Sequence, residues 1–359
     1  MSKPKRKVIV GMSGGVDSSV AAALLLQQGY EVIGVFMKNW SDNFAVLDDC
    51  PWQKDLADAQ AVAEKLNIPL EVFNFEQQYK RQVIDYFFSE YKVGRPPNPD
   101  ILCNSEIKFK LFFEQALSLG VDYIATGHYA RIKRIKSGVQ LLKGKDQNKD
   151  QSYFLYGINP QVLEHVLFPV GDYTKSEIRN LARQMKLPTK DKPDSQGICF
   201  IGEVDLRLFL SQYIKATPGD IIDAESKKVI GRHEGLAWYT IGQRRGIKVG
   251  GTGLPLYVVD KDMKKNILYV VKGAHHPKLY KKELVASNIN WLVKQTKFPL
   301  TVKAKIRYRQ ADQEAIIDYL DKNNKLLTVQ FKEPQRAVTP GQSVVFYQGD
   351  VCLGGGIIQ

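Results

Sequence analysis

The stretch that most constrains this chain is residues 7–29, KVIVGMSGGVDSSVAAALLLQQG, which has the pattern of an apolar strand, a glycine turn and a helix. Such a turn leaves backbone N–H groups free at the N-terminus of the helix, where an anion is stabilised. The nucleotide loop G-x-x-x-x-G-K-[ST] adds a lysine that reaches the outer phosphates, but here Asp17 and Ser18 stand near that position. The turn therefore suits phosphate, but it lacks the lysine that serves the transfer of an outer phosphoryl group.

The first 190 residues alternate between strand-like and helix-like segments. Strands are predicted at 7–12, 30–38, 69–75 and 122–130, and helices at 17–29, 55–67, 79–94 and 107–120. Nearly continuous apolar strands between amphipathic helices indicate a parallel sheet that is covered by helices on both faces. Ligands bind at the carboxyl ends of the strands in such folds, and we expect the glycine turn, Met37 and residues 126–128 there.

The pattern changes near residue 217, where short strand-like segments punctuated by glycine begin and continue to the end of the chain. These segments predict one or two small modules that resemble β-barrels. We therefore expect an α/β parallel-sheet, Rossmann-like domain over residues 1–210. A central β-rich domain over 211–280 and a C-terminal β-barrel domain over 281–359 are expected to follow it.

The chain carries a formal net charge of +13, and much of the excess lies in two basic runs. Residues 131–149 hold seven lysines and arginines against one acid, and residues 294–310 hold six against none, with Tyr308 between two arginines. One run alone would be read as a solvated basic surface, but two runs and a large global excess favour a polyanionic partner, RNA or DNA. No run approaches the roughly 18 apolar residues of a membrane span, so we expect a cytoplasmic protein without a membrane partner.

The four cysteines are far apart and form no C-x-x-C motif, which argues against a zinc ribbon or a thioredoxin-type site. Cys103 ends a proline-rich segment that is predicted to be a loop just before a helix. There the nearby Lys108 and Lys110 could lower its pKa, although a buried filler is an equal alternative. Cys199 lies in a mostly irregular segment, and the two thiols together suggest paired sulfur chemistry. Cys50 and Cys352 have no such context, and structural roles are expected for them.

The pattern S-G-G-x-D-S at residues 13–18 resembles the pyrophosphate loop of the ATP-pyrophosphatase superfamily, whose members cleave ATP between the α- and β-phosphates. Such an enzyme would hold the leaving pyrophosphate on backbone amides and on Ser13, Ser18 and Ser19. Asp17 would repel phosphate by itself, so it implies either Mg²⁺ or a helix N-cap. A glycine turn capped by serine and aspartate, with no ligand, is the alternative.

Taken together, the motifs resemble those of the tRNA-specific 2-thiouridylase family along essentially the whole chain. The resemblance is carried by GMSGGVDSS, FMKNW, GRPPNPDILCNSEIKF, ATGHYAR, KDQSYFL, DSQGICFIGE, TIGQRRG, RYRQ and TPGQSVVFYQGDVCLGGGII. It implies an enzyme that adenylates the 2-oxygen of the wobble uridine in certain tRNAs and then replaces that oxygen with sulfur from a persulfide. Cys199 would carry the persulfide, and Cys103 would complete the transfer and leave a Cys103–Cys199 disulfide.

The same resemblance implies the binding residues and partners. The residues implied for ATP are Gly11, Met12, Ser13, Gly14, Gly15, Val16, Asp17, Ser18, Met37 and Gly127. Those implied for the target base are Asn98, Pro99 and Asp100. Those implied for tRNA are His128, Lys149, Asp150, Gln151, Arg307, Tyr308 and Gln342. The expected cofactors are ATP and Mg²⁺, and the expected partners are a tRNA and a persulfide-donating sulfur carrier or cysteine desulfurase. We expect a monomer.

Three alternatives stay open at this point. Another ATP pyrophosphatase could adenylate a different substrate for amidation, but it would need neither the cysteine pair nor the basic C-terminal half. An RNA-binding protein without catalytic activity would keep the charge but would not need the loop. An iron–sulfur cluster on Cys103 and Cys199 could replace persulfide chemistry.

Overall fold

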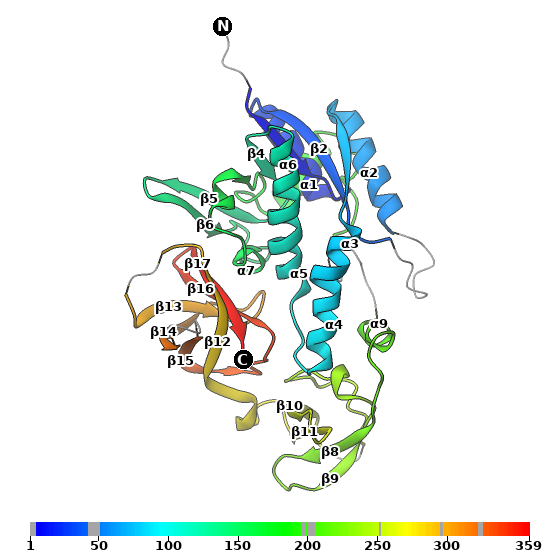
Figure 1. The fold of residues 1–359 in the computed structure, drawn as a ribbon, viewed down its shortest axis with the longest axis vertical. Helices are drawn as coiled ribbons and strands as arrows, with labels where there is room; N and C mark the ends of the chain where they lie inside the picture. Colours follow the sequence, from blue (N-terminus) through cyan, green and yellow to red (C-terminus); the bar gives the residue numbers. More distant parts are fainter. Residues whose placement is uncertain are drawn as a thin grey trace.

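The structure is a computed structural model, and it describes residues 5–41, 51–194, 199, 205–250, 253–294, 297–321 and 326–359. Figure 1 shows an N-terminal domain of sheet and helices at the top, a β-barrel below it on one side, and a small β domain at the lower end. The C-terminus lies in the middle of the molecule, at the barrel, far from the N-terminus. The predicted order of one α/β part and two β-rich parts is confirmed.

The N-terminal domain is built on a five-stranded sheet in the order β3-β2-β1-β4-β7, and every neighbouring pair is parallel. Its strands are β1 (Lys7–Gly11), β2 (Glu31–Lys38), β3 (Leu70–Asn74), β4 (Tyr123–Ala125) and β7 (Val166–Leu167). Its α-helices are α1 (Val16–Gln27), α2 (Pro51–Leu66), α3 (Glu76–Tyr79), α4 (Asp85–Lys92), α5 (Pro99–Leu102), α6 (Phe112–Ser118), α7 (Ser152–Leu155), α8 (Lys175–Gln184) and α9 (Leu206–Ser211). Two π-helical segments, η1 (Lys80–Ile84) and η2 (Cys103–Leu111), and a 3₁₀ turn, η3 (Val162–His165), complete it.

Central strand β1 explains why the sheet is covered on both faces. Its residues after Lys7 are buried, because side chains that alternate along a strand point into two different layers. Ile9 packs in one apolar cluster with the helices that follow β3, whereas Val8 and Val10 pack in a second cluster with α1 and α8. The near-continuous apolar strand seen in the sequence thus serves two cores at once.

The structure corrects two local predictions. The strand predicted over 122–130 stops at Ala125 and a separate strand begins at Ala130, since the chain turns at Gly127 against α1. A Cβ at Gly127 would lie only 2.7 Å from the backbone N of Ser18, so only glycine fits this approach. The helix predicted to follow Cys103 instead begins at Pro99 and continues through η2 and α6, which places Cys103 inside it.

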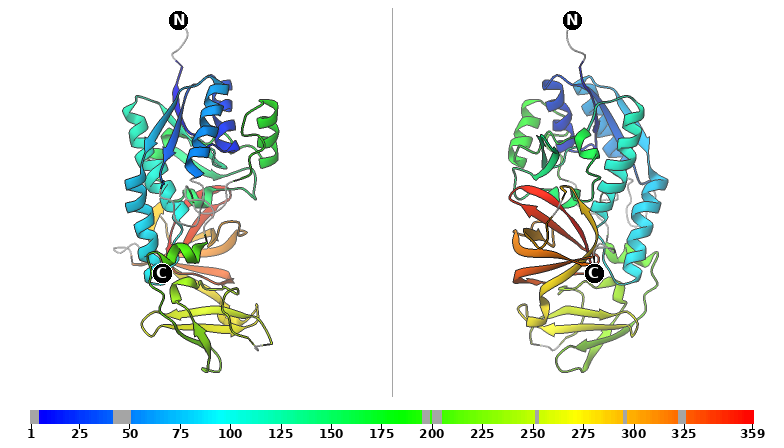
Figure 2. Two further views of the ribbon diagram at one scale, coloured as in Figure 1. Left: turned by 90° about the vertical axis from the view of Figure 1, so that its right-hand side faces the viewer. Right: turned by 60° about the vertical axis from the view of Figure 1, so that its left-hand side comes forward.

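The central domain is a four-stranded sheet in the order β10-β11-β8-β9. Its elements are β8 (Gly219–Asp223), β9 (Val229–His233), η4 (Leu236–Trp238), β10 (Leu256–Asp262), β11 (Ile267–Lys272) and η5 (Pro277–Leu279). It has its own apolar core around Ile221, Val258 and Val270, apart from the cores of the other two domains. Figure 2 shows this domain at the lower end of the molecule from two further sides.

The C-terminal domain closes into the barrel that the sequence predicted. Its strands are β12 (Tyr280–Trp291), β13 (Leu300–Lys305), β14 (Gln313–Asp321), β15 (Leu326–Arg336), β16 (Ser343–Gln348) and β17 (Val351–Ile358). They pair in the order β12-β15-β14-β13-β16-β17, and the pairing of β12 with β17 closes the ring. Closure leaves no free sheet edge among these strands.

A hairpin of the N-terminal domain joins the barrel sheet, which the sequence did not predict. Strands β5 (Ala130–Ile135) and β6 (Gly138–Lys143) form this hairpin, and β6 pairs with β17 at Leu142 and Val351. Behind it, Tyr153 donates a 2.9 Å hydrogen bond to the carbonyl of Ser343 in the barrel. The barrel is therefore fastened to the domain that carries the glycine turn.

Candidate active site

The glycine turn between β1 and α1 has the geometry of an anion loop. Gly14 has a φ of +68°, and a Cβ there would lie 2.3 Å from the carbonyl oxygen of Asp55 in α2. Gly15 is the N-cap of α1 and provides no side chain to occupy the free N–H groups. Ser13 is exposed, and its backbone N–H donates to the hydroxyl of Ser18 at 3.2 Å.

The structure changes the expected parts of two residues in this loop. Ser19 is fully buried and donates to the carbonyl of Gly15 at 2.8 Å, while Thr189 donates to it, so its hydroxyl does not face the loop opening. Asp17 lies in the first turn of α1 and is not its N-cap, so the N-cap alternative is wrong. Its carboxylate instead accepts hydrogen bonds from Tyr129 at 2.7 Å and from the ammonium of Lys175 at 2.7 and 2.8 Å.

The other residues implied for ATP surround the same turn. Met12 is buried, and its N–H donates to Val35 of β2. The methyl group of Met37 approaches Gly11, where a Cβ would lie 2.9 Å from it. Gly127 lies against α1 as described above. The structure therefore gathers the implied set, from Gly11 to Ser18 with Met37 and Gly127, at the carboxyl edge of the sheet.

The structure also brings together the two cysteines that the sequence singled out. The Sγ atoms of Cys103 and Cys199 are 3.7 Å apart, well beyond the 2.05 Å or so of a disulfide bond, and both thiols are free. Two groups hold the backbone of Cys199: its N–H donates to Asp100 at 3.3 Å, and its carbonyl accepts from the hydroxyl of Tyr79 at 2.6 Å. The thiols are thus in contact although 96 residues separate them in the chain.

The two thiols differ in how readily they ionise. The hydrogen bond from Cys103 lowers the pKa of Cys199 below the usual range of a thiol, and the charge of Lys108 lowers it further against the effect of burial. Burial raises the pKa of Cys103 well above that range, and the hydrogen bond to Cys199 adds to the effect. The sequence had pointed to a lowered pKa at Cys103, but its thiol is fully buried, so Cys199 is the cysteine that ionises first.

Lys108 is the cation of this site, whereas Lys110 is not. Burial alone would lower the pKa of Lys108, but the negative charges that Cys199, Cys103 and Asp100 can carry raise it overall. Lys110 is exposed and forms an ion pair with Glu106 one turn away, at 2.7 Å. On a helix, neighbouring lysines point in different directions, and only Lys108 faces the thiols.

The segment implied for the target base lies beside the cysteines. Asn98 is the N-cap of α5 and accepts a 3.1 Å hydrogen bond from the N–H of Asp100, with Pro99 at the first helical position. Burial raises the pKa of Asp100, while the charge of Lys108 opposes this effect. The barrel reaches this segment through Gln342, whose amide donates to the carbonyls of Pro96 and Pro97 at 2.6 and 3.3 Å.

Several residues implied for tRNA contact are engaged inside the protein. His128 is 8% exposed and bonds to Thr126 at 2.7 Å, and burial, together with the charge of Lys108, lowers its pKa well below the usual range. Asp150 is buried and accepts from the backbone N–H groups of Gly144 and Ser152. These side chains shape the site in this structure, and their contact with tRNA stays a prediction.

The other implied tRNA residues lie nearer the surface. Gln151 accepts a 2.9 Å hydrogen bond from the N–H of Tyr129, and Lys149 pairs with Asp194 at 2.6 Å. Tyr308 packs on Phe154, with ring centroids 4.5 Å apart, while Arg307 is exposed. They come from the N-terminal domain and from the barrel, on the side where the two are joined.

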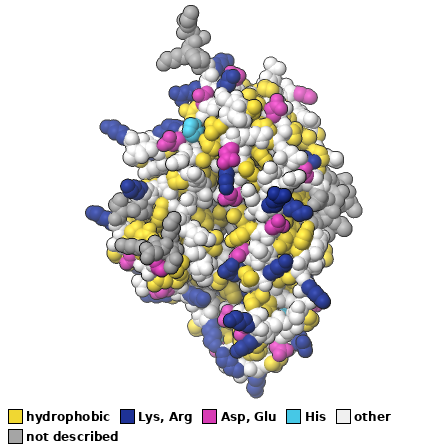
Figure 3. Space-filling model, viewed as in Figure 1, with side chains coloured by type: hydrophobic (Ala, Val, Ile, Leu, Met, Phe, Trp, Pro, Cys, Tyr) yellow, Lys and Arg dark blue, Asp and Glu magenta, His cyan; other side chains and the backbone are white. Residues whose placement is uncertain are grey.

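The basic runs are less free than the sequence suggested. Six of their side chains form ion pairs with acids from other parts of the chain: Arg131, Lys143, Lys145, Lys149, Lys303 and Lys305. On the face shown in Figure 3, basic and acidic side chains are interspersed over most of the surface, and dark-blue side chains gather at the lower end, over the central domain. The net charge is therefore not concentrated in the two runs alone.

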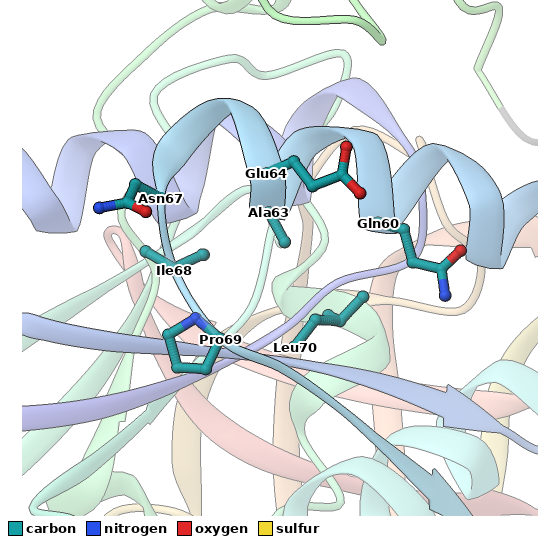
Figure 4. A pocket seen from close by; sticks show the side chains of 7 residues that line it. All are labelled: Gln60, Ala63, Glu64, Asn67, Ile68, Pro69 and Leu70. Carbon is teal, nitrogen blue, oxygen red and sulfur yellow. The ribbon is translucent and has the colours of Figure 1, made fainter.

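A surface hollow elsewhere in the N-terminal domain is separate from this site. Figure 4 shows it between the end of α2 and the start of β3, with a volume of about 500 Å³ and lining residues that include Glu64, Asn67 and Pro69. It contains neither the glycine turn nor the cysteines.

None of the helices that the structure describes is both long and apolar enough for a membrane span.

Lys175 and Asp194 are two site residues that the sequence analysis missed. Lys175 opens α8, whose capping box joins Thr174 and Glu177. The pattern T-K-S-E would have predicted this helix start, and in a parallel α/β fold a helix start lies near the ligand edge. Asp194 begins the motif DSQGICFIGE, but no local pattern indicates its contact with Lys175, because the fold alone brings the two together.

Three domain families match consecutive parts of the chain. The tRNA methyl transferase HUP domain matches residues 6–203, the tRNA methyl transferase PRC-barrel domain 207–272, and the aminomethyltransferase beta-barrel domain 281–358. The likeness to two solved structures is weak: a 4-thiouridine synthetase–RNA complex with bound ATP has a TM-score of 0.33 and 17% identity, covering 52% of this chain and 43% of its own. An NH3-dependent NAD synthetase from Campylobacter jejuni has a TM-score of 0.31 and 20% identity, covering 54% and 71%. Neither adds to the assignment.

Curated relatives match along nearly the whole chain. The tRNA-specific 2-thiouridylase MnmA of Marinomonas sp. (strain MWYL1) is 54% identical, with 98% of this chain and 91% of the relative covered. The enzyme of the same name from Legionella pneumophila (strain Lens) is 53% identical over 99% of both, and that of Staphylococcus aureus (strain bovine RF122 / ET3-1) is 51% identical over 100% and 96%. The names of the matched domain families refer to methyl transferases, but these relatives, matched along nearly their whole length, are named thiouridylases. Two thiols in contact suit sulfur transfer. The resemblance seen in the sequence is thus confirmed: the chain belongs to the tRNA-specific 2-thiouridylase family.

Proposed function

We propose that this chain is an ATP-dependent sulfurtransferase that converts the wobble uridine of certain tRNAs to 2-thiouridine. The observation that carries the proposal is the contact of two free thiols with unequal acidity, 3.7 Å apart. The glycine turn in the same domain supplies the nucleotide site, because free N–H groups at the start of α1 suit a phosphate. An ATP pyrophosphatase that catalyses amidation would need the loop but not the thiols.

The proposed first step activates the base. The 2-oxygen of uridine attacks the α-phosphorus of ATP, the bond to the β-phosphate breaks, and pyrophosphate leaves with the electron pair. The loop from Ser13 to Ser18 holds the departing group on its backbone amides, which explains a phosphate loop with no lysine of its own. Asn98, Pro99 and Asp100 would hold the base beside Cys199.

The second proposed step transfers sulfur. The terminal sulfur of a persulfide on Cys199 attacks C2 of the base, and the Cys103 thiolate then attacks the Sγ of Cys199. The sulfur–sulfur bond of the persulfide breaks with its electron pair on the base sulfur, and AMP leaves as the C=S bond forms. A Cys103–Cys199 disulfide remains, and an external dithiol must reduce it before the next turnover.

The order of ionisation supports these roles. Cys199 has the lowered pKa and the greater exposure, so its thiolate can take sulfur from a donor. Cys103 is a thiol at rest, because burial raises its pKa, and a persulfide on Cys199 would remove the hydrogen bond that adds to this rise. The donor would be a persulfide-bearing sulfur carrier or a cysteine desulfurase.

We also propose that Mg²⁺ accompanies ATP and that the protein acts as a monomer. Asp17 fits as the carboxylate that would hold the ion, since Mg²⁺ is commonly bound by one or two carboxylates together with substrate phosphates. Within the described ranges, no group of three or more His, Cys, Asp or Glu converges as metal ligands. For an iron–sulfur cluster, Cys103 and Cys199 would supply two of the four usual thiolates. Iron and sulfide analysis of anaerobically purified protein tests that alternative.

Domain boundaries near residues 210 and 280 are proposed as well. Helix α9 (Leu206–Ser211) ends just before the central sheet, and β12 begins the barrel at Tyr280. The three matched domain families change over between 203 and 207, a few residues before the first position, and between 272 and 281, a range that includes the second.

The deciding experiment separates the two cysteines by mass spectrometry after incubation with a persulfide donor, ATP and tRNA. Cys199→Ser is expected to accept no sulfur. Cys103→Ser is expected to carry a persulfide at Cys199 but to form no 2-thiouridine. Cys352→Ser is the matched control, because Cys352 is a buried thiol of β17, in the barrel, and its loss should leave thiolation intact. Normal thiolation by Cys199→Ser would refute the mechanism.

A second experiment tests the loop. Ser13→Ala and Asp17→Ala are expected to abolish tRNA-dependent release of pyrophosphate and to leave tRNA affinity largely unchanged, because the loop has no feature that reads RNA. Release is measured with a coupled pyrophosphatase assay and affinity by fluorescence anisotropy. Unchanged release in both variants would remove the loop from the reaction.

A further inference from the structure

The nucleotide loop has no lysine in its own sequence, yet a lysine from a distant part of the chain stands beside it. The ammonium of Lys175, at the start of α8, lies 2.7 and 2.8 Å from the two carboxylate oxygens of Asp17 in the first turn of α1. It also lies 2.7 Å from a carboxylate oxygen of Asp194. The side chain is only 13% exposed, so its charge acts across little water.

Lys175 belongs to a compact cluster of charged side chains. Lys149 and Arg179 both contact Asp194, at 2.6 and 2.7 Å. Burial alone would raise the pKa of Asp194, but its hydrogen bonds from Lys149 and Lys175 lower it to about 2. Three cations and the two carboxylates Asp17 and Asp194 thus meet beside the loop, and a third carboxylate, that of Asp146, accepts from the backbone N–H of Lys175 and balances the charge.

A cation at this place would favour an adenylation step. When the bond between the α- and β-phosphates breaks, negative charge accumulates on the leaving pyrophosphate, and preorganised donors around it lower the barrier. The loop itself supplies backbone N–H groups, but the charged residue within its sequence, GMSGGVDSS, is Asp17, which repels phosphate. A cation beside Asp17, in addition to the proposed Mg²⁺, offsets this repulsion.

We propose that Lys175 is the substrate-contacting cation that binds the pyrophosphate portion of ATP, an inference that rests on the proposed adenylation. Its partners in this structure, Asp17 and Asp194, balance its charge while no nucleotide is bound, so the lysine can remain partly buried. A lysine ammonium on its flexible stem can exchange a carboxylate oxygen for a phosphate oxygen by a small movement. Asp17 is then released from its ion pair.

The competing explanation is a purely structural tie. Lys175 joins α1 to α8 through Asp17, and its backbone N–H also donates to Asp146 at 2.9 Å. A structural tie would support the whole nucleotide site, so its loss should weaken the binding of every nucleotide equally. If Lys175 instead contacts the pyrophosphate portion, its loss should weaken only the nucleotides that carry the outer phosphates.

Isothermal titration of the full chain in the presence of Mg²⁺, with inorganic pyrophosphate, ATP and AMP as separate probes, makes this distinction. Lys175→Met is expected to weaken the affinity for pyrophosphate and for ATP about tenfold or more, because one charge-assisted hydrogen bond is lost. The affinity for AMP should change by less than about twofold. Lys175→Arg keeps the charge and should retain most of the pyrophosphate affinity. If Lys175→Met does not fold, Lys175→Gln against Lys175→Arg gives the same comparison.

Two further variants complete the test. Lys145→Ala removes an exposed lysine that pairs with Glu177 of the same helix α8, and it should change none of the three affinities. Asp194→Asn removes a competitor for Lys175, so its pyrophosphate affinity should equal or exceed that of the wild type. Equal losses for ATP and AMP in Lys175→Met, or a loss in Asp194→Asn as large as in Lys175→Met, would overturn the inference.

These measurements need neither tRNA nor a sulfur donor, so they are independent of the thiolation assay. If the wild type binds pyrophosphate through Lys175 but forms no 2-thiouridine, the proposed function fails and the anion site stands. If thiolation proceeds and Lys175→Met binds pyrophosphate like the wild type, only this inference fails.

Discussion

The two arginines that flank Tyr308 should respond differently to substitution, although the sequence places them in one basic run. The guanidinium of Arg307 donates to the carbonyls of Arg336 and Ala337 at 3.0 and 2.6 Å, so part of it serves the barrel. Arg309 is exposed, and its guanidinium lies 5.4 Å from the centre of the Tyr308 ring. We therefore expect Arg309 to act mainly on tRNA phosphate and Arg307 to act on stability as well.

The magnitude follows from counterion release. Each phosphate contact contributes about −0.7 to −0.9 to the slope of log affinity against log salt. Between about 50 and 200 mM salt, one contact thus accounts for a roughly threefold change in affinity. Arg309→Ala should flatten the slope by about 0.7 to 0.9 and leave the melting temperature unchanged. Arg307→Ala should cost about 1–3 kcal/mol of stability, because two carbonyls lose a charged donor.

The assay is fluorescence anisotropy of a labelled anticodon stem-loop across that salt range, with thermal unfolding followed in parallel. Lys65→Ala is the control: it removes one exposed lysine from the last turn of α2, which Figure 1 shows on the other side of the molecule from β13 and β14. Its slope should match that of the wild type. Equal slopes for Arg309→Ala and the wild type would show that Arg309 faces solvent in the complex, and the reasoning would fail.

Three further predictions concern the thiols, the loop and the joint with the barrel. The rate of alkylation of Cys199 should rise at a lower pH than that of an ordinary thiol, because the hydrogen bond from Cys103 lowers the pKa of Cys199. Cys352, whose pKa is raised by burial to about 12, should stay unmodified at pH 8. Peptide mass spectrometry measures both rates, and equal pH profiles would contradict the prediction. Gly14→Ala should destabilise the chain by roughly 1–3 kcal/mol and lower its affinity for ATP, since the φ of Gly14 is +68° and a Cβ would meet a backbone carbonyl. Chemical unfolding measures the stability and titration the affinity, and a neutral effect would argue against the loop geometry. Asn290→Ala should lower the free energy of unfolding by about 2 kcal/mol, because it removes two hydrogen bonds, of 2.6 and 2.9 Å, to backbone carbonyls of the N-terminal domain. An unchanged stability by calorimetry would mean that water replaces these bonds.

The parallel sheet and the glycine turn could be predicted because their signals are local. The residues of β1 after Lys7 are buried, and the turn follows directly from the backbone freedom of glycine and the start of a helix. The closed barrel was predicted only as a class, because strand order depends on pairings such as that of β12 with β17, which are distant in the chain. The hairpin β5–β6 was read as a charged run because its partner strand, β17, lies at the other end of the sequence.

The site shows the same division. The sequence by itself determined that the chain carries a phosphate loop and two isolated cysteines, and family resemblance connected them to sulfur transfer. It misplaced Cys103 before a helix, because Pro99 reads as a loop residue when it is in fact the first residue of the helix. A proline at that position has no N–H to lose, so the helix tolerates it there.

Tertiary structure alone decided which thiol is acidic and which charges are free. The pKa of Cys199 depends on the hydrogen bond from Cys103, and that bond exists only because the fold brings residues 96 positions apart into contact. The lysine that the loop lacks in sequence arrives from α8, 158 residues away. Local patterns encode backbone conformation, but electrostatic interactions depend on distance and burial, and these are properties of the folded chain.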